Sequence, residues 1–180
     1  MKTLVTGGVR SGKSAAAEAA VSTASAASAD NAVVYVATGP TTDDPDWADR
    51  IAEHRARRPT DWTVLETTDL AAALADRTEA LLVDCLGTWL TARLDALAVW
   101  DAPSAEWAGA LDTEFDAVVD ALAARREPAV LVTNEVGLGL VAPHRSGRIF
   151  ADSLGRLNQR VAAVCDRVVL VVAGQSLVIK

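Results

Sequence analysis

Several kinds of residue are scarce in this chain, and each scarcity excludes a class of protein. The 180 residues include only two cysteines, Cys85 and Cys165, which are too few for a disulfide framework, so we expect free thiols and a cytoplasmic location. Basic residues are outnumbered, and the net charge of −7 argues against a nucleic-acid or anionic membrane partner. No apolar run approaches the roughly 20 residues of a membrane span. A chain of this length is expected to form one domain, residues 1–180.

A glycine-rich pattern, G-x-x-x-x-G-K-S, directly follows an apolar run near the start of the chain. Its members are Gly7, Gly8, Val9, Arg10, Ser11, Gly12, Lys13 and Ser14. In such loops the backbone amides surround nucleotide phosphates, the lysine reaches the β and γ oxygens, and the hydroxyl of the last residue ligates Mg²⁺. The alternative is a strand–turn–helix corner that carries these residues by chance. The pattern therefore predicts nucleotide binding, with Ser14 as a metal ligand.

Short apolar runs alternate along the rest of the chain with segments of helix length. The clearest runs are 3–6, 32–37, 80–83, 129–132 and 168–172, with weaker ones at 63–65 and 177–179. The helix-length segments are 13–28, 45–57, 69–76, 86–98, 104–125 and 148–165, and Ser104 is the expected N-cap of the fifth. Apolar runs without polar alternation are typical of strands buried on both faces. The order predicts a P-loop NTPase-like α/β fold, with a doubly wound, mostly parallel sheet and helices on both faces.

Two carboxylates follow predicted strands. Asp84 ends the run 80–83, which places it at the carboxyl edge of the sheet, where ligands of open α/β folds bind. Together with Ser14 it is the expected second Mg²⁺ contact, although an Asp at this place is alone more often a turn or cap residue. Glu135, after the fourth run, is a base, a group that supports a metal ligand, or simply part of a turn.

A histidine lies among arginines in the segment 50–58. At helical spacing Arg50, His54 and Arg58 share one face, and guanidinium groups suit phosphate oxygens. Nearby positive charge disfavours the imidazolium and keeps a ring nitrogen free as a nucleophile. The alternative is a solvated helix face supported by i, i+4 ion pairs. The spacing alone does not decide between these interpretations.

These segments, in this order, resemble the bifunctional adenosylcobinamide kinase/adenosylcobinamide-phosphate guanylyltransferase family of cobalamin (vitamin B12) biosynthesis. The resemblance spans nearly the whole chain. It rests on residues 6–14, 35–38, 50–51 with His54, 58–59 with Trp62 and Glu66, 83–86 with 89–91, 134–139, and Gly155 with 158–159. Members often carry Glu-Met where this chain has Asp46-Trp47, so the loop that enters the histidine segment departs from the family pattern.

The resemblance implies two reactions. Adenosylcobinamide would first be phosphorylated with ATP or GTP, and GMP would then pass from GTP, through a covalent intermediate on His54, to adenosylcobinamide phosphate. The product would be adenosylcobinamide-GDP. The resemblance further implies nucleotide contacts at Ala37, Thr38, Gly39, Arg55, Ala56, Arg57, Arg58, Glu66 and Asp84. It also implies a homotrimer with sites near subunit contacts.

Two other functions stay open at this point. One is another P-loop small-molecule kinase, in which His54 is only a surface residue and no GMP becomes bound to the protein. The other is a nucleotide-dependent regulatory binder, although the chain has no Asn-Lys-x-Asp guanine-reading motif. Tryptophans on the alanine-rich helices, Trp89 among them, are expected in the core or in contacts between subunits.

Overall fold

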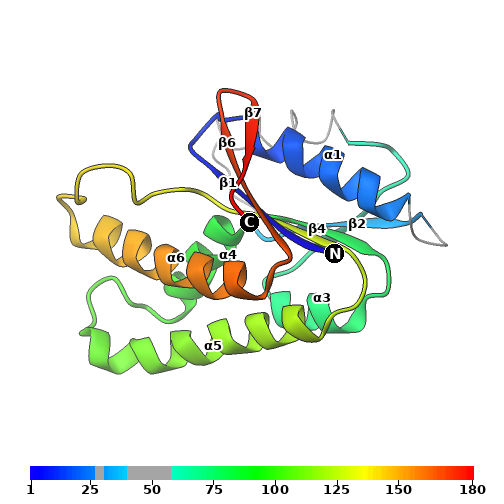
Figure 1. The fold of residues 1–180 in the computed structure, drawn as a ribbon. Helices are drawn as coiled ribbons and strands as arrows, with labels where there is room; N and C mark the ends of the chain where they lie inside the picture. Colours follow the sequence, from blue (N-terminus) through cyan, green and yellow to red (C-terminus); the bar gives the residue numbers. More distant parts are fainter. Residues whose placement is uncertain (27–30, 40–57) are drawn as a thin grey trace.

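One sheet of seven strands runs through the residues that the computed structural model describes, 1–26, 31–39 and 58–180 (Figure 1). The strands are β1 (Lys2–Gly7), β2 (Val33–Ala37), β3 (Thr63–Glu66), β4 (Ala80–Asp84), β5 (Ala129–Val132), β6 (Arg167–Val172) and β7 (Gln175–Val178). Their spatial order is β3-β2-β4-β5-β1-β6-β7, and every neighbouring pair is parallel except β6 and β7. The predicted mostly parallel sheet is confirmed, including both of the weaker strands.

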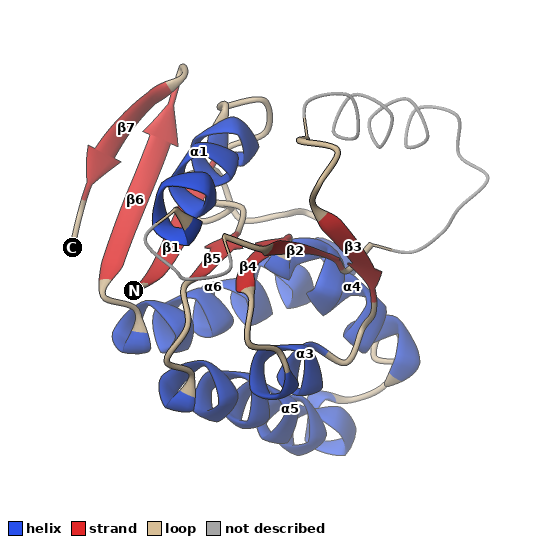
Figure 2. Cartoon of the chain, turned by 90° about the vertical axis from the view of Figure 1, so that its right-hand side faces the viewer, coloured by secondary structure: helices blue, strands red, loops and turns tan. Residues whose placement is uncertain are grey.

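Helices cover both faces of this sheet (Figure 2). The described helices are α1 (Lys13–Ser25), α3 (Leu70–Asp76), α4 (Leu86–Ala96), α5 (Ser104–Ala124) and α6 (Arg145–Val164). Of these, α1 lies on one face, and α3, α4, α5 and α6 lie on the other. The predicted arrangement with helices on both faces is therefore confirmed.

The two faces have separate cores because successive strand residues point to opposite sides. Leu4 packs toward α3–α6, whereas its neighbour Val5 packs toward α1. Along β4 the same alternation puts Leu82 on the α1 side, and Asp84, two residues further on, shares that parity. On the other face, Trp89 and Trp107 are 2% and 7% exposed. These two tryptophans therefore belong to the core rather than to a subunit contact.

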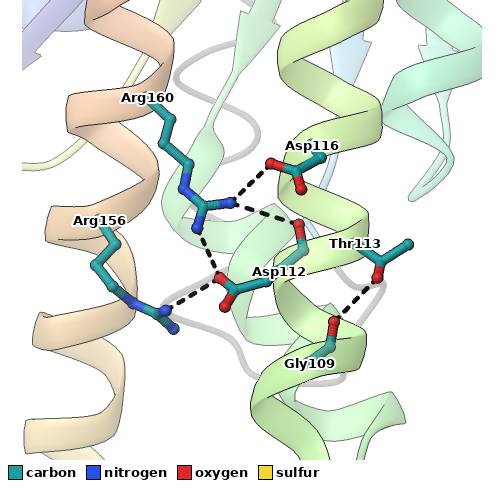
Figure 3. A network of polar contacts seen from close by, with 6 residues as sticks. All are labelled: Gly109, Asp112, Thr113, Asp116, Arg156 and Arg160. Carbon is teal, nitrogen blue, oxygen red and sulfur yellow. Dashed lines mark hydrogen bonds and ion pairs between the residues drawn. The ribbon is translucent and has the colours of Figure 1, made fainter.

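Helices α5 and α6 are joined by a polar network (Figure 3). Asp112 of α5 accepts hydrogen bonds from Arg156, at 3.0 Å, and from Arg160, at 2.9 Å. Arg160 also pairs with Asp116 at 2.9 Å. Both guanidinium groups lie within 6 Å of the Phe115 ring centroid, at 5.9 and 5.6 Å. Because these side chains are partly exposed, each ion pair contributes at most about 1 kcal/mol, and the network chiefly fixes the alignment of the two helices.

Several helix boundaries differ from those expected. Helix α6 begins at Arg145 rather than at residue 148, and its N-cap, His144, makes no side-chain capping bond. The start is held instead by the Arg145 guanidinium, which donates to the carbonyl oxygens of Val99 and Trp100 in the loop before α5. The expected N-cap Ser104 was wrong, since Pro103 holds that position. Helix α1 ends at Ser25, before the predicted end at residue 28. The predicted helix 45–57 lies outside the described residues.

No described helix combines the length and the apolar character needed to cross a bilayer.

Candidate functional site

The predicted phosphate loop connects β1 to α1, and two of its glycines, Gly7 and Gly12, occupy positions where another residue would be strained. Gly12 is the N-cap of α1 with φ 93°, in the left-handed region, and an added Cβ there would lie 3.2 Å from the Cα of Gly174. A Cβ on Gly7 would lie 2.5 Å from the carbonyl oxygen of Val171. The loop thus fits closely against β6 and the turn after it, where the Gly174 amide donates to the Ser11 carbonyl oxygen at 2.8 Å.

Lys13 lies across this loop. Its side chain is buried, with 6% of the residue exposed, and its Nζ donates to the carbonyl oxygen of Gly8 at 3.2 Å. Ser14 is half-buried and follows Lys13 in the first turn of α1. This first turn contains no acidic residue, and the N-cap makes no side-chain hydrogen bond to it. The first amides of a helix lack partners within the helix and carry a partial positive charge. The N-terminus of α1 and the Lys13 ammonium group together form a cationic cradle suited to phosphates.

Three of the predicted nucleotide-contact residues lie at neighbouring positions of the sheet edge. In the register of the strands, Ala37 at the end of β2 pairs with Glu66 of β3 on one side and with Asp84 of β4 on the other. Asp84 in turn pairs with Val132, the last residue of β5. Because the strands are parallel, their carboxyl ends meet at the edge where β1 enters the phosphate loop. The predicted location of Asp84 at this edge is confirmed.

A buried tyrosine contacts the Asp84 carboxylate. The hydroxyl of Tyr35 donates to Oδ2 of Asp84 at 3.1 Å, and the guanidinium carbon of Arg58 lies 3.7 Å from the centroid of the tyrosine ring. Burial raises the pKa of Tyr35 well above its usual value, and the charge of Asp84 raises it further, whereas Arg58 lowers it in part. The phenol therefore stays protonated and remains a donor.

Thr38 is part of a hydroxyl network at the end of β2. It is fully buried, and its Oγ1 donates to the carbonyl oxygen of Cys85 at 2.7 Å and lies 2.9 Å from Oγ1 of Thr88. This hydroxyl is thus engaged within the protein, so a nucleotide contact at Thr38 would use its backbone. Burial, with the charge of Asp84, raises the pKa of the Cys85 thiol, which keeps it neutral.

The turn after β5 is tied to the phosphate loop. The Glu135 amide donates to the Gly7 carbonyl oxygen at 3.1 Å, and Oε1 of Glu135 accepts the Gly137 amide at 2.8 Å. Asn158 of α6 joins the same turn, since its side-chain amide donates to the Asn134 carbonyl oxygen at 3.2 Å. The Glu135 carboxylate thus stabilises its own turn, as the simplest of the three interpretations expects.

The remaining predicted site residues fall into two groups. Gly8, Val9, Arg10 and Gly39 are exposed around the site. His54, Arg55, Ala56 and Arg57 lie outside the described residues. In the described part of the chain, no three or more His, Cys, Asp or Glu side chains gather as a metal-binding group. The two predicted metal ligands, the Ser14 hydroxyl and the Asp84 carboxylate, are both oxygen donors.

Sequence reasoning did not assign a role to Tyr35 or Thr88. Tyr35 was among the residues that carry the family resemblance, and it is a lone phenol in the otherwise aliphatic strand Val33–Ala37. A hydroxyl at a buried position requires a partner, which was the physical signal for a role. Nothing in the spacing of Thr88 distinguished it from other threonines at the start of a helix.

Comparisons with known proteins extend over this whole arrangement. The family model described as cobinamide kinase / cobinamide phosphate guanyltransferase (CobU) matches residues 3–179. The bifunctional adenosylcobalamin biosynthesis protein CobP of Pseudomonas aeruginosa is 41% identical over 184 residues, covering 100% of this chain and 98% of the relative. The bifunctional adenosylcobalamin biosynthesis proteins CobU of Salmonella typhimurium and Escherichia coli are each 40% identical, over 191 and 189 residues. Each of these two matches covers 100% of this chain and 100% of the relative. The matched span includes the positions of the phosphate loop, His54 and Asp84.

Proposed function

The chain belongs to the cobinamide kinase/cobinamide phosphate guanyltransferase family, and on that premise we propose that it catalyses both reactions on adenosylcobinamide in adenosylcobalamin biosynthesis. The observation that carries the proposal is the cradle formed by Lys13 and the start of α1, beside a sheet edge that ends in Asp84. Such a cradle grips a nucleotide polyphosphate, and the family match supplies the acceptor.

In the first reaction, the hydroxyl oxygen of adenosylcobinamide attacks the γ-phosphorus of ATP or GTP. The bond from that phosphorus to the bridging oxygen breaks, and ADP or GDP leaves. Lys13 and the loop amides from Gly7 to Ser14 hold the phosphates and stabilise the charge that develops on them. The hydroxyl proton passes to a base or to solvent.

In the second reaction, a ring nitrogen of His54 attacks the α-phosphorus of GTP and pyrophosphate leaves. A phosphate oxygen of adenosylcobinamide phosphate then attacks the phosphorus of the histidine–GMP bond, which breaks and returns the imidazole. Arg55 and Arg58 would stabilise the phosphate charge in both transfers, and Ala37, Gly39, Ala56, Arg57 and Glu66 would contact the nucleotide. The support is the family match across this segment and the position of Arg58 against Tyr35.

We propose Mg²⁺ as the cofactor. The donor set fits, because the Ser14 hydroxyl and the Asp84 carboxylate are hard oxygen donors, and a nucleotide-bound Mg²⁺ needs only one or two protein oxygens beside phosphate and water. When bound, the ion neutralises charge on the transferred phosphate. Asp84 is fixed for this task by the Tyr35 hydroxyl.

The proposed assembly is a homotrimer in the cytoplasm. Exposed aliphatic side chains support the assembly, notably Leu138, Leu140 and Val141 in the turn before α6, which are 86%, 101% and 82% exposed. Specific contacts of this kind bury at least about 1,000 Å². Both cysteines are free thiols, in keeping with a reducing compartment.

Incubation with labelled GTP tests the proposal. Label from the α-phosphate should remain on the denatured wild-type protein, survive alkali and be lost in acid, as a phosphoramidate requires. Label from the γ-phosphate should not remain. His54→Asn should abolish the adduct and guanylyl transfer while GTP binding persists, because the phosphate loop supplies the main grip.

The matched control is His144→Asn, which removes the only other histidine of the chain, the residue at the N-cap of α6. This variant should label as the wild type does. If His54→Asn still yields adenosylcobinamide-GDP at a near wild-type rate, or if the adduct maps to His144, the guanylyl proposal is wrong. Phosphorylation of adenosylcobinamide without any adduct would favour the simple kinase.

A further inference from the structure

The one tyrosine of the chain contacts Asp84 and Arg58, two residues with proposed roles in the reactions. Tyr35 is 5% exposed and faces the α1 side of the sheet together with Leu82 and Val132. In the β2–β4 register it pairs with Leu82, and Asp84 is two residues further along β4, on the same face. Long aromatic side chains reach such diagonal neighbours. The 3.1 Å hydrogen bond from the phenol to Oδ2 of Asp84 is thus a direct consequence of strand register.

The ring of the same side chain has a second partner. The Arg58 guanidinium stacks 3.7 Å from the ring centroid, within the range of a cation–π interaction, and Arg58 is half-buried there. Arg58 is four residues from His54, and His54 itself lies outside the described residues. One side chain therefore contacts both the carboxylate proposed to bind Mg²⁺ and an arginine of the histidine segment.

From these contacts we infer that Tyr35 is a positioning residue for both reactions: its hydroxyl fixes the Asp84 carboxylate, and its ring holds Arg58. The inference rests on the proposed function. A carboxylate held by a hydrogen bond loses less rotamer freedom when it takes a metal ion. A guanidinium already stacked on an aromatic ring is likewise placed before the phosphate arrives. Tyr35 contacts neither the metal nor the nucleotide in this account, and it acts through its two neighbours.

Tyr35→Phe tests the hydroxyl, since it removes that group and keeps the ring. Calorimetry should show affinity for Mg²⁺–GTP reduced at least about tenfold, the effect of losing a hydrogen bond to a charged group. Affinity for GTP in EDTA should stay within about twofold of wild type, because the phosphate loop is untouched. A general loss of structure would weaken both affinities alike.

A double-mutant cycle separates action through Asp84 from any other effect of the hydroxyl. Asp84→Asn keeps the shape of the side chain and removes its charge. If Tyr35 acts through Asp84, adding Tyr35→Phe to Asp84→Asn should change Mg²⁺–GTP affinity by less than about twofold. The matched control is Thr133→Val, which removes a buried hydroxyl that donates to Oδ1 of Asn158 at 2.6 Å. That control should leave the Mg²⁺ dependence unchanged.

Tyr35→Leu tests the ring. It loses both partners, so the rate of adduct formation on His54 should fall at least about threefold below that of Tyr35→Phe, consistent with the loss of one cation–π contact. The inference is overturned if Tyr35→Phe binds Mg²⁺–GTP as wild type does, if its effect persists undiminished with Asp84→Asn, or if Leu and Phe form the adduct equally fast. A wild-type protein that forms no adduct would overturn the guanylyl proposal instead, and the calorimetric arm would still test the hydroxyl.

Discussion

Replacing Lys13 should separate nucleotide binding from folding. The side chain is buried, and its ammonium donates to the Gly8 carbonyl oxygen across the phosphate loop. Lys13→Met keeps an unbranched stem and removes the charge with its three donors. The loss of a charge-assisted contact to phosphate is worth about 1.5–3 kcal/mol. GTP affinity should therefore fall between about tenfold and 150-fold, at 1.4 kcal/mol for each factor of ten.

Folding stability should respond differently. An ammonium group away from water carries a desolvation cost, and methionine carries none, so the free energy of unfolding without nucleotide should stay equal or rise by about 1 kcal/mol. Calorimetry with Mg²⁺–GTP and denaturant unfolding measure the two quantities. The control is Lys2→Met at the opposite end of β1, where Nζ donates to the Ala123 carbonyl oxygen at 2.7 Å. Equal GTP affinity in Lys13→Met, or an equal loss in Lys2→Met, would refute the reasoning.

Two further predictions concern other parts of the chain. Gly12→Ala should weaken GTP binding and destabilise the fold by at least about 1–2 kcal/mol, because φ 93° is unfavourable for alanine and the added Cβ would press on the Gly174 backbone. A variant with wild-type GTP affinity and melting temperature would contradict this. Burial raises the pKa of Cys165 from 9.0 to about 11, so the thiol of the unfolded chain loses its proton at lower pH than the thiol of the folded chain. The free energy of unfolding should therefore fall by about 2–3 kcal/mol between pH 9.0 and about 11. Denaturant unfolding across that range measures the fall, and Cys165→Ala should lack this share of it.

Much of the site's framework could be predicted because it depends on short stretches of sequence. The phosphate loop needs only a strand, glycines at Gly7 and Gly12, and a helix start, all within a few residues. Asp84 was placed correctly since an apolar run that ends in a carboxylate puts that carboxylate at the sheet edge once the strands are parallel. These inferences required no knowledge of which strands are neighbours.

The rest depended on contacts between distant segments. The bond between Tyr35 and Asp84 joins residues 49 positions apart and exists because β2 and β4 pair in one register, although β3 lies between them in the sequence. The early start of α6 has a similar cause, since Arg145 is held by carbonyl groups of the loop at Val99 and Trp100 rather than by a local cap. A sequence pattern records neither register nor long-range anchoring.

The contact between Gly174 and the phosphate loop bears on when that loop can take shape as the chain folds. Residues 7–14 carry the whole binding motif, yet the loop is packed against Val171 and Gly174, which are joined to it only after β1 and β6 have paired. Contacts between residues so far apart in sequence form slowly, because a large loop must close first. A peptide containing only the motif and α1 should therefore bind nucleotide poorly. In refolding experiments, recovery of GTP binding should follow completion of the central sheet and lag behind the return of helical signal.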